Sequence, residues 1–207
     1  MRLRENTPAE SDDDAALMLR AKVGDQGAFA KLYDRNARSV VNFVHRFVPD
    51  RARAEELSQE IFLKVYRSAG SYEPRARFKT FLFRIAANHC INERRRGEYR
   101  AQVRETEVED GDRPVERAGP QGEGPDAALA GRDLERALGE ALSELSDRER
   151  AAFAMCRFEG MAYRDIADAL GASEAAVKSL IHRATVAVAR KLTPLVGEDP
   201  LAAARGK

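Results

Sequence analysis

The chain has 207 residues, of which 33% are charged and 7% aromatic, and it contains no tryptophan. This composition is more typical of small helical domains than of a large β core, and the length allows two small domains or one of medium size. The formal net charge is +1, so the chain as a whole does not resemble a basic nucleic-acid-binding protein, although its charges are distributed in blocks.

The amino-terminal segment, residues 1–13, is polar and acidic and is predicted to be a disordered tail. It lacks the apolar run of a secretory signal, and no stretch approaches the roughly 20 apolar residues that a transmembrane helix requires. We therefore expect a cytoplasmic protein with no membrane insertion of its own. Cys90 and Cys156 are far apart and form no cluster with the three histidines, so neither a metal site nor a cofactor is expected.

Residues 14–98 show helical periodicity almost throughout and are predicted to form the first domain. One helical segment ends before Pro49, because the residue before a proline disfavours the α conformation. The next segment carries Leu57, Ile61 and Val65 in one apolar stripe at a spacing of four.

A break at residues 70–77 precedes a basic helix. From Arg75 to Arg104, nine basic residues are opposed by two acidic ones, a net charge of +7. An apolar stripe directs Leu82, Ile85, Ala86 and His89 inward, which leaves polar side chains on the outer face: Arg84, Asn88, Asn92 and Arg95.

Residues 99–130 contain glycines and prolines among acidic residues and almost no apolar ones, which predicts a flexible linker. From Glu105 to Glu144, twelve acidic residues are opposed by four basic ones, a net charge of −8. A basic block beside an acidic block allows a nearly neutral chain to carry a DNA-binding surface.

Residues 131–196 are predicted to form a second helical domain, and residues 197–207 a tail. Leucines and alanines from Leu134 to Leu145 recur at helical spacing. The following Ser146–Glu149 segment has the form of a capping box, which marks the start of another helix.

The segment Tyr163–Leu192 predicts a short helix, a tight turn at Gly171 and a longer helix capped by Ser173. This is the pattern of a helix-turn-helix, whose second helix can enter a major groove, although an ordinary helical hairpin has the same pattern. The residues expected on the exposed face of the second helix, called the recognition set, are Ser173, Glu174, Ala175, Lys178, Ser179, His182 and Arg183. The predicted fold is therefore all-α, with two small helical domains joined by a flexible linker and a helix-turn-helix in the second.

Four segments occur in a characteristic order: GDQGAFAKLYDRN, AEELSQEIFLKVYR, FKTFLFRIAANHCINERRR and LSELSDRERAAFAMCRFEGMAYRDIADALGASEAAVKSLIHRA. Together they resemble the extracytoplasmic-function (ECF) group of bacterial sigma factors, over about residues 17–96 and 134–192. The resemblance implies that the first domain binds core RNA polymerase and the minus-ten element of promoter DNA, and that the second binds the minus-thirty-five element. It also implies an anti-sigma factor as a partner.

The second segment resembles the principal polymerase-binding helix of the family. The residues that it implies, called the polymerase set, are Glu56, Gln59, Glu60, Leu63 and Arg67.

The third segment resembles the part of the family that melts and reads the minus-ten element. The residues that it implies, called the minus-ten set, are Phe78, Lys79, Phe81, Arg84, Asn88, Asn92, Arg95 and Arg96. Asparagine can read base edges, arginine can hold phosphates, and aromatic side chains can receive unstacked bases.

Two other functions are weighed against that of a sigma factor. The first is a dimeric helix-turn-helix transcriptional regulator whose amino-terminal domain senses a ligand. The second is a nucleic-acid enzyme, but the sequence contains no motif of paired carboxylates, no H-E-x-x-H, no P-loop and no G-x-S-x-G. We therefore do not expect an enzyme.

Overall fold

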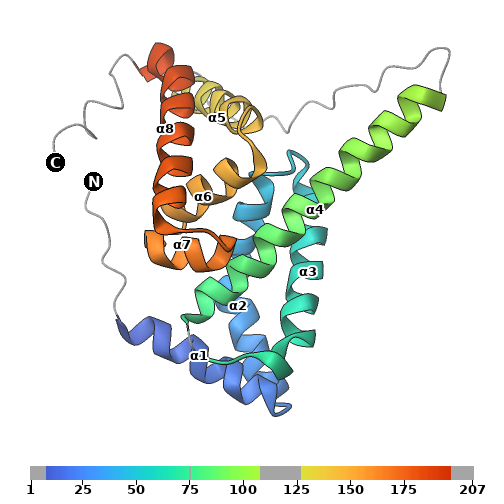
Figure 1. Ribbon diagram of the computed structural model, residues 1–207, viewed down its shortest axis with the longest axis vertical. Helices are drawn as coiled ribbons and strands as arrows, with labels where there is room; N and C mark the ends of the chain where they lie inside the picture. The colour runs from blue at the N-terminus through green and yellow to red at the C-terminus, as the bar shows by residue number, and fades with distance from the viewer. Residues whose placement is uncertain (1–7, 75, 108–126, 197–207) are drawn as a thin grey trace.

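The computed structural model describes residues 8–74, 76–107 and 127–196. Within these ranges the chain forms helices and their connections, with no strand, which confirms the all-α prediction. The elements in chain order are α1 (Pro8–Lys22), α2 (Gln26–His45), α3 (Arg51–Arg67), the 3₁₀ turn η1 (Ala69–Ser71), α4 (Phe78–Glu107), α5 (Ala127–Ser143), α6 (Asp147–Arg157), α7 (Tyr163–Leu170) and α8 (Glu174–Val196). Helices α1–α4 form the first domain and α5–α8 the second, with α4 running diagonally past α7 (Figure 1).

Short polar side chains begin several of the helices. The carboxylate of Asp25 accepts a hydrogen bond from the backbone of Ala28 at 2.9 Å, and Asp50 accepts one from Arg53 at 3.0 Å. Each bond satisfies a backbone N–H group that has no partner within its own helix. These starts depend on neighbouring residues only, so they are visible in the sequence.

The predicted linker is shorter at both ends than the sequence suggested. Helix α4 continues to Glu107, and α5 begins at Ala127, whereas the linker was predicted over residues 99–130. The reason is compositional, because the first glycine beyond residue 97 is Gly111 and residues 127–130 are three alanines and a leucine, all good helix formers. The remainder of the predicted linker lies outside the described residues.

The predicted amino-terminal tail is also shorter in the structure. Helix α1 begins at Pro8, within the segment predicted as a tail, and Arg35 of α2 pairs with Asp13 and Asp14 at 3.0 Å each. Proline is well tolerated in the first turn of a helix, because its missing N–H group would have no helical partner there. Residues 1–7 and 197–207 lie outside the described residues.

One apolar core extends through both domains. It includes Phe43 of α2 and Phe83 of α4 from the first domain, and Met155 of α6 and Ile166 of α7 from the second. A smaller core, formed by α5, α6 and α8, lies within the second domain and consists of Ala141, Leu142, Leu145, Phe153, Ala184 and Val188. The sequence predicted two domains, and the structure adds that α4 packs directly against α6 and α7.

The predicted capping box is present at the start of α6. The Ser146 hydroxyl accepts from the backbone of Glu149 at 3.4 Å, and the Glu149 carboxylate accepts from the backbone of Ser146 at 3.1 Å. The backbone carbonyl groups of Ser143 and Leu145, just before the capping box, accept hydrogen bonds from the buried side chain of Arg150. This arrangement secures the corner between α5 and α6.

Replacing Ser146 with alanine is expected to lower the free energy of unfolding by about 1 kcal/mol, because the helix start loses its cap. Urea unfolding followed by circular dichroism measures the change. Ser179→Ala is the control, because that hydroxyl only donates to Ala175 one turn earlier in the same helix, so its loss is expected to cost less than about 0.5 kcal/mol. Equal losses for the two variants would contradict a capping role.

Candidate nucleic-acid interface

Helix α4 presents one apolar and one polar face. Leu82, Ala86 and His89 are buried and Ile85 is half-buried, as the periodicity predicted. The polar members of the minus-ten set that are exposed on the other side are Arg84, Asn88, Asn92, Arg95 and Arg96. The structure therefore places amide and guanidinium side chains together on the exposed side of a single helix.

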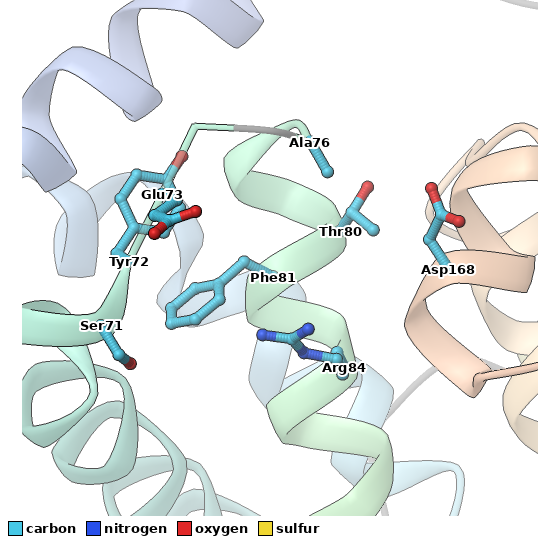
Figure 2. A pocket seen from close by; sticks show the side chains of 8 residues that line it. All are labelled: Ser71, Tyr72, Glu73, Ala76, Thr80, Phe81, Arg84 and Asp168. Atoms are coloured by element: carbon cyan, nitrogen blue, oxygen red, sulfur yellow. The ribbon is translucent and has the colours of Figure 1, made fainter.

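A cleft of about 350 Å³ lies at the beginning of this face. Its lining comes from the connection before α4, from the first two turns of α4 and from α7: Ser71, Tyr72, Glu73, Ala76, Thr80, Phe81, Arg84 and Asp168. Figure 2 shows Phe81 and Arg84 on α4, with Asp168 on the helix across the cleft. The guanidinium of Arg84 lies 5.4 Å from the centre of the Phe81 ring, so an aromatic side chain and a cation meet at the cleft.

Phe78 corrects the minus-ten set. Phe78 is 1% exposed and its ring packs 6.3 Å from that of Tyr72, so in this structure it belongs to the core and is not on the exposed surface where a DNA contact was expected. Phe81 is also largely buried, with its ring 5.0 Å from that of Tyr72, but it lines the cleft. Periodicity could not separate these two roles, because residues three positions apart lie on the same face of a helix.

Lys79 is the second member of the set with a different environment from the one expected. Its ammonium lies 3.2 Å from a carboxylate oxygen of Glu159 and donates to the backbone carbonyl of that residue at 2.7 Å. In this arrangement the ammonium group of Lys79 is directed toward the second domain.

The polymerase set lies along α3. Glu56, Gln59, Leu63 and Arg67 are exposed, and Leu63 is 53% exposed. Tyr66 is also exposed and lies three residues from Leu63, which places the two side chains on the same part of the helix surface. Tyr66 was not predicted as a member of the polymerase set, although the sequence shows an aromatic residue three positions after Leu63.

Glu60 differs from the rest of the polymerase set because its carboxylate is directed toward α4. One oxygen lies 3.2 Å from Nε2 of His89, and the other lies 4.0 Å from Arg53. Burial and the neighbouring Lys64 ammonium lower the pKa of His89 below its ordinary value. Glu60 and His89 thus connect the polymerase set to the helix of the minus-ten set.

The helix-turn-helix forms as predicted. Gly171 ends α7 with φ of 56°, a left-handed conformation that glycine adopts without strain, and the Ser173 hydroxyl accepts from the backbone of Ala176 at 3.2 Å to begin α8. Every member of the recognition set is exposed. Val177, Ile181 and Ala184 form the buried stripe that holds α8 in place.

Arg183 has a partner within its own domain. Its Nε donates to the carboxylate of Glu149 at 2.6 Å. Burial raises the pKa of Glu149, but hydrogen bonds from Ser146 and Arg183 outweigh that effect, and the pKa lies below its ordinary value of 4.5. The pair therefore stabilises the fold above about pH 4.5, and this stabilisation is lost as the pH falls through the lowered pKa of the folded state.

Replacing Lys178 with alanine is expected to reduce the slope of log affinity against log salt concentration by about one, because one phosphate contact is lost. Arg183→Ala is expected to change the slope less and to destabilise the fold, since Arg183 holds Glu149 in the free protein. Titrations of DNA binding at several salt concentrations measure both slopes. An unchanged slope for Lys178→Ala would show that this face of α8 does not contact phosphates.

Two further features were sought in the part of the chain that the structure describes. No helix there is both long and apolar enough to cross a membrane. Across the same residues, no three His, Cys, Asp or Glu side chains gather in a group that could hold a metal ion.

Comparison with family models divides the chain as the structure does. The model of Sigma-70 region 2 matches residues 32–100, which contain α3, the cleft connection and most of α4. The model of Sigma-70 region 4 matches residues 135–187, which include α7, the turn at Gly171 and the first part of α8.

Curated relatives match nearly the whole chain. The chain is 30% identical to the RNA polymerase sigma-H factor of Pseudomonas aeruginosa over 192 residues, which is 90% of this chain and 97% of the relative. It is 34% identical to the RNA polymerase sigma factor CarQ of Myxococcus xanthus over 191 residues, which is 91% of this chain and all of the relative. Identity to the ECF RNA polymerase sigma-E factor of Haemophilus influenzae is 30% over 189 residues, with 91% and 100% covered.

Solved structures share the fold. CnrH in complex with the cytosolic domain of CnrY matches with a TM-score of 0.65 and 23% identity, over 88% of this chain and 99% of that one. The sigma factor RpoE of Bartonella quintana, in complex with the anti-sigma factor NepR, matches with a TM-score of 0.61 and 22% identity, over 80% and 96%.

Proposed function

This chain belongs to the ECF group of RNA polymerase sigma factors, and on that premise we propose how its two domains recognise a promoter. The first domain binds core polymerase through α3 and reads and opens the minus-ten element through α4. The second domain places α8 in the major groove of the minus-thirty-five element. The observation that carries this proposal is the alignment of Arg84, Asn88 and Asn92 on one exposed face beside the cleft.

The cleft explains how opened DNA would be held. A base that leaves the duplex loses its stacking partners, and a pocket with an aromatic wall and polar groups can replace them. Phe81 provides the ring, Arg84 provides a cation at the rim, and Thr80 and Glu73 provide polar groups within the same lining. Asn88 and Asn92, one and two turns further along α4, are placed to contact the neighbouring bases.

Core polymerase is proposed to bind the exposed side of α3. Leu63 and Tyr66 provide an apolar centre, and Glu56, Gln59 and Arg67 surround it with charged and polar groups. An apolar centre with a polar rim is the usual composition of a protein interface. The protein acts as a specificity subunit, and the chemistry of RNA synthesis belongs to the polymerase.

An anti-sigma factor is proposed as a further partner, and the chain is proposed to act in the cytoplasm, where core polymerase acts. The two solved structures described above each hold their chain in complex with a second protein, which for the sigma factor RpoE is the anti-sigma factor NepR. The regulator with a ligand-sensing domain, considered from the sequence, is not favoured, because the amino-terminal domain matches Sigma-70 region 2.

Run-off transcription tests the proposal directly. Core polymerase supplemented with the purified chain, and given genomic DNA of the organism that encodes it, is expected to start transcripts at a small set of sites that core polymerase alone does not use. Sequencing the 5′ ends of the transcripts identifies the promoters. The absence of any added start site would contradict the proposal.

A further inference from the structure

The turn between α6 and α7 projects two side chains toward the first domain. Gly160 adopts φ of +63°, and the backbone of Met161 donates to Met155 at 3.0 Å, while Phe158 donates to Ala154 at 3.0 Å. These bonds close the end of α6 into a defined turn. Phe158 and Glu159 stand at its apex, so their positions are set by the backbone of the second domain.

Glu159 is held by residues of two helices in the first domain. Its carboxylate accepts from the Ser39 hydroxyl of α2 and lies 3.2 Å from the Lys79 ammonium of α4, which also donates to the Glu159 carbonyl. The Glu159 side chain is only 7% exposed. A buried carboxylate is tolerated when its charge is paired and hydrogen-bonded, and here both partners come from the other domain.

Two more contacts join the domains around this point. The Arg46 guanidinium of α2 lies 4.1 Å from the centre of the Phe158 ring, and Arg94 of α4 lies 3.1 Å from the Asp147 carboxylate at the start of α6. Asp168 of α7 lines the cleft beside α4, so an acidic side chain of the second domain stands where bound DNA would place its own negative charge (Figure 2). The cleft and the exposed face of α4 with Arg84, Asn88 and Asn92 are called the minus-ten surface, and the second domain covers one side of it.

This arrangement cannot bind both promoter elements together. Elements centred near positions −10 and −35 are about 25 base pairs apart, or about 85 Å along B-form DNA at 3.4 Å per pair. Helix α7 packs against both α4 and α8, and packed helices lie about 8–10 Å apart, so α4 and α8 are separated by only about 20 Å. The domains must separate before α4 and α8 can occupy their two elements.

We propose that the packed arrangement is a closed state of the free protein in which Glu159 latches the second domain over the minus-ten surface and weakens DNA binding. This inference rests on the proposed function for the identity of that surface. The latch withdraws Lys79 from DNA and keeps Asp168 at the cleft. If about one molecule in ten is open, the apparent affinity for DNA is reduced about tenfold relative to that of the open form.

Two variants test the latch in the full chain. Glu159→Arg places a cation against Lys79, and Ser39→Asp places a carboxylate against Glu159, so each replaces an attraction across the interface with a repulsion. The control is Glu144→Arg, which makes the same change in net charge within the second domain. Glu144 pairs with Lys191 at 2.7 Å, and both residues belong to that domain.

Small-angle X-ray scattering measures opening, and binding of a labelled random-sequence single-stranded 20-mer measures access to the minus-ten surface. Glu159→Arg and Ser39→Asp are expected to increase the radius of gyration and to bind the 20-mer about tenfold more tightly than the unmodified chain. Glu144→Arg is expected to leave the radius unchanged and to change the affinity less. A gain in Ser39→Asp is decisive, because that variant adds negative charge and cannot bind DNA better through general attraction.

Two results would overturn the inference. If Glu159→Arg and Ser39→Asp scatter like the unmodified chain, Glu159 does not hold the domains together. If they are extended but bind the 20-mer no more tightly, the packing does not restrict DNA. Failure of the proposed function is distinguishable from both, because it appears as an absence of added transcripts with core polymerase and leaves the scattering comparison unchanged.

Discussion

Replacing Arg84 and Asn88 together with alanine is expected to abolish promoter opening while leaving polymerase binding intact. The two residues are four apart on α4 and exposed, so they share one helix face, and Arg84 also lines the cleft. Their loss removes a phosphate or base contact at the cleft and a base-edge reader one turn away. Neither side chain belongs to the core, so the fold is expected to lose only about 0.5 kcal/mol per site.

Permanganate footprinting of the melted strand, beside co-purification with core polymerase, measures the two activities separately. The control is Arg100→Ala, which removes an exposed arginine further along the same helix and outside the minus-ten set. It is expected to open DNA normally. If the double variant opens DNA as well as Arg100→Ala does, the melting surface has been assigned to the wrong face of α4.

Replacing Leu63 with aspartate is expected to weaken binding to core polymerase by roughly 30-fold or more, which corresponds to about 2 kcal/mol at an interface centre. Leu63 is 53% exposed on α3 with Tyr66 beside it, and a carboxylate there would be buried without a partner in the complex. Promoter opening by the variant is expected to recover when polymerase is supplied in excess, because the α4 face is unchanged.

Fluorescence anisotropy of the labelled chain, titrated with core polymerase, measures this affinity. Leu19→Asp is the matched control, because Leu19 is an exposed leucine on α1, at 41%, and lies outside the polymerase set. It is expected to bind core polymerase normally. Equal loss in both variants would mean that the effect comes from reduced stability or a broader surface, and that the α3 assignment is wrong.

Local features of the fold were predictable because their causes are local. The capping box at Ser146, the left-handed turn at Gly171 and the cap at Ser173 each depend on residues no more than four positions apart. The inward stripe of α4 follows from spacing in the same way. The ends of the linker were less accurate, because helix-forming residues continue for several positions before the first glycine and after the last proline.

The sequence predicted which side chains lie on the exposed helix faces more accurately than it predicted the contacts of each side chain. The outer face of α4 and the exposed face of α8 are where spacing placed them. Phe78 and Phe81 have the same side chain three residues apart, and both rings pack near Tyr72 from a different segment, yet only Phe81 lines the cleft. Glu60 and Arg183 were expected to face partners, and both have ion-pair contacts inside this chain.

By itself, the sequence determined the helical class, the helix starts, the helix-turn-helix and the order of the two regions, because each is encoded by short-range spacing and by residue type. Only the tertiary structure decided which of these surfaces is available. Ser39 and Glu159 are 120 positions apart, and Lys79 and Glu159 are 80 positions apart. No periodicity or capping rule extends over such separations in sequence. A contact between these residues therefore depends on how the two folded domains pack against each other.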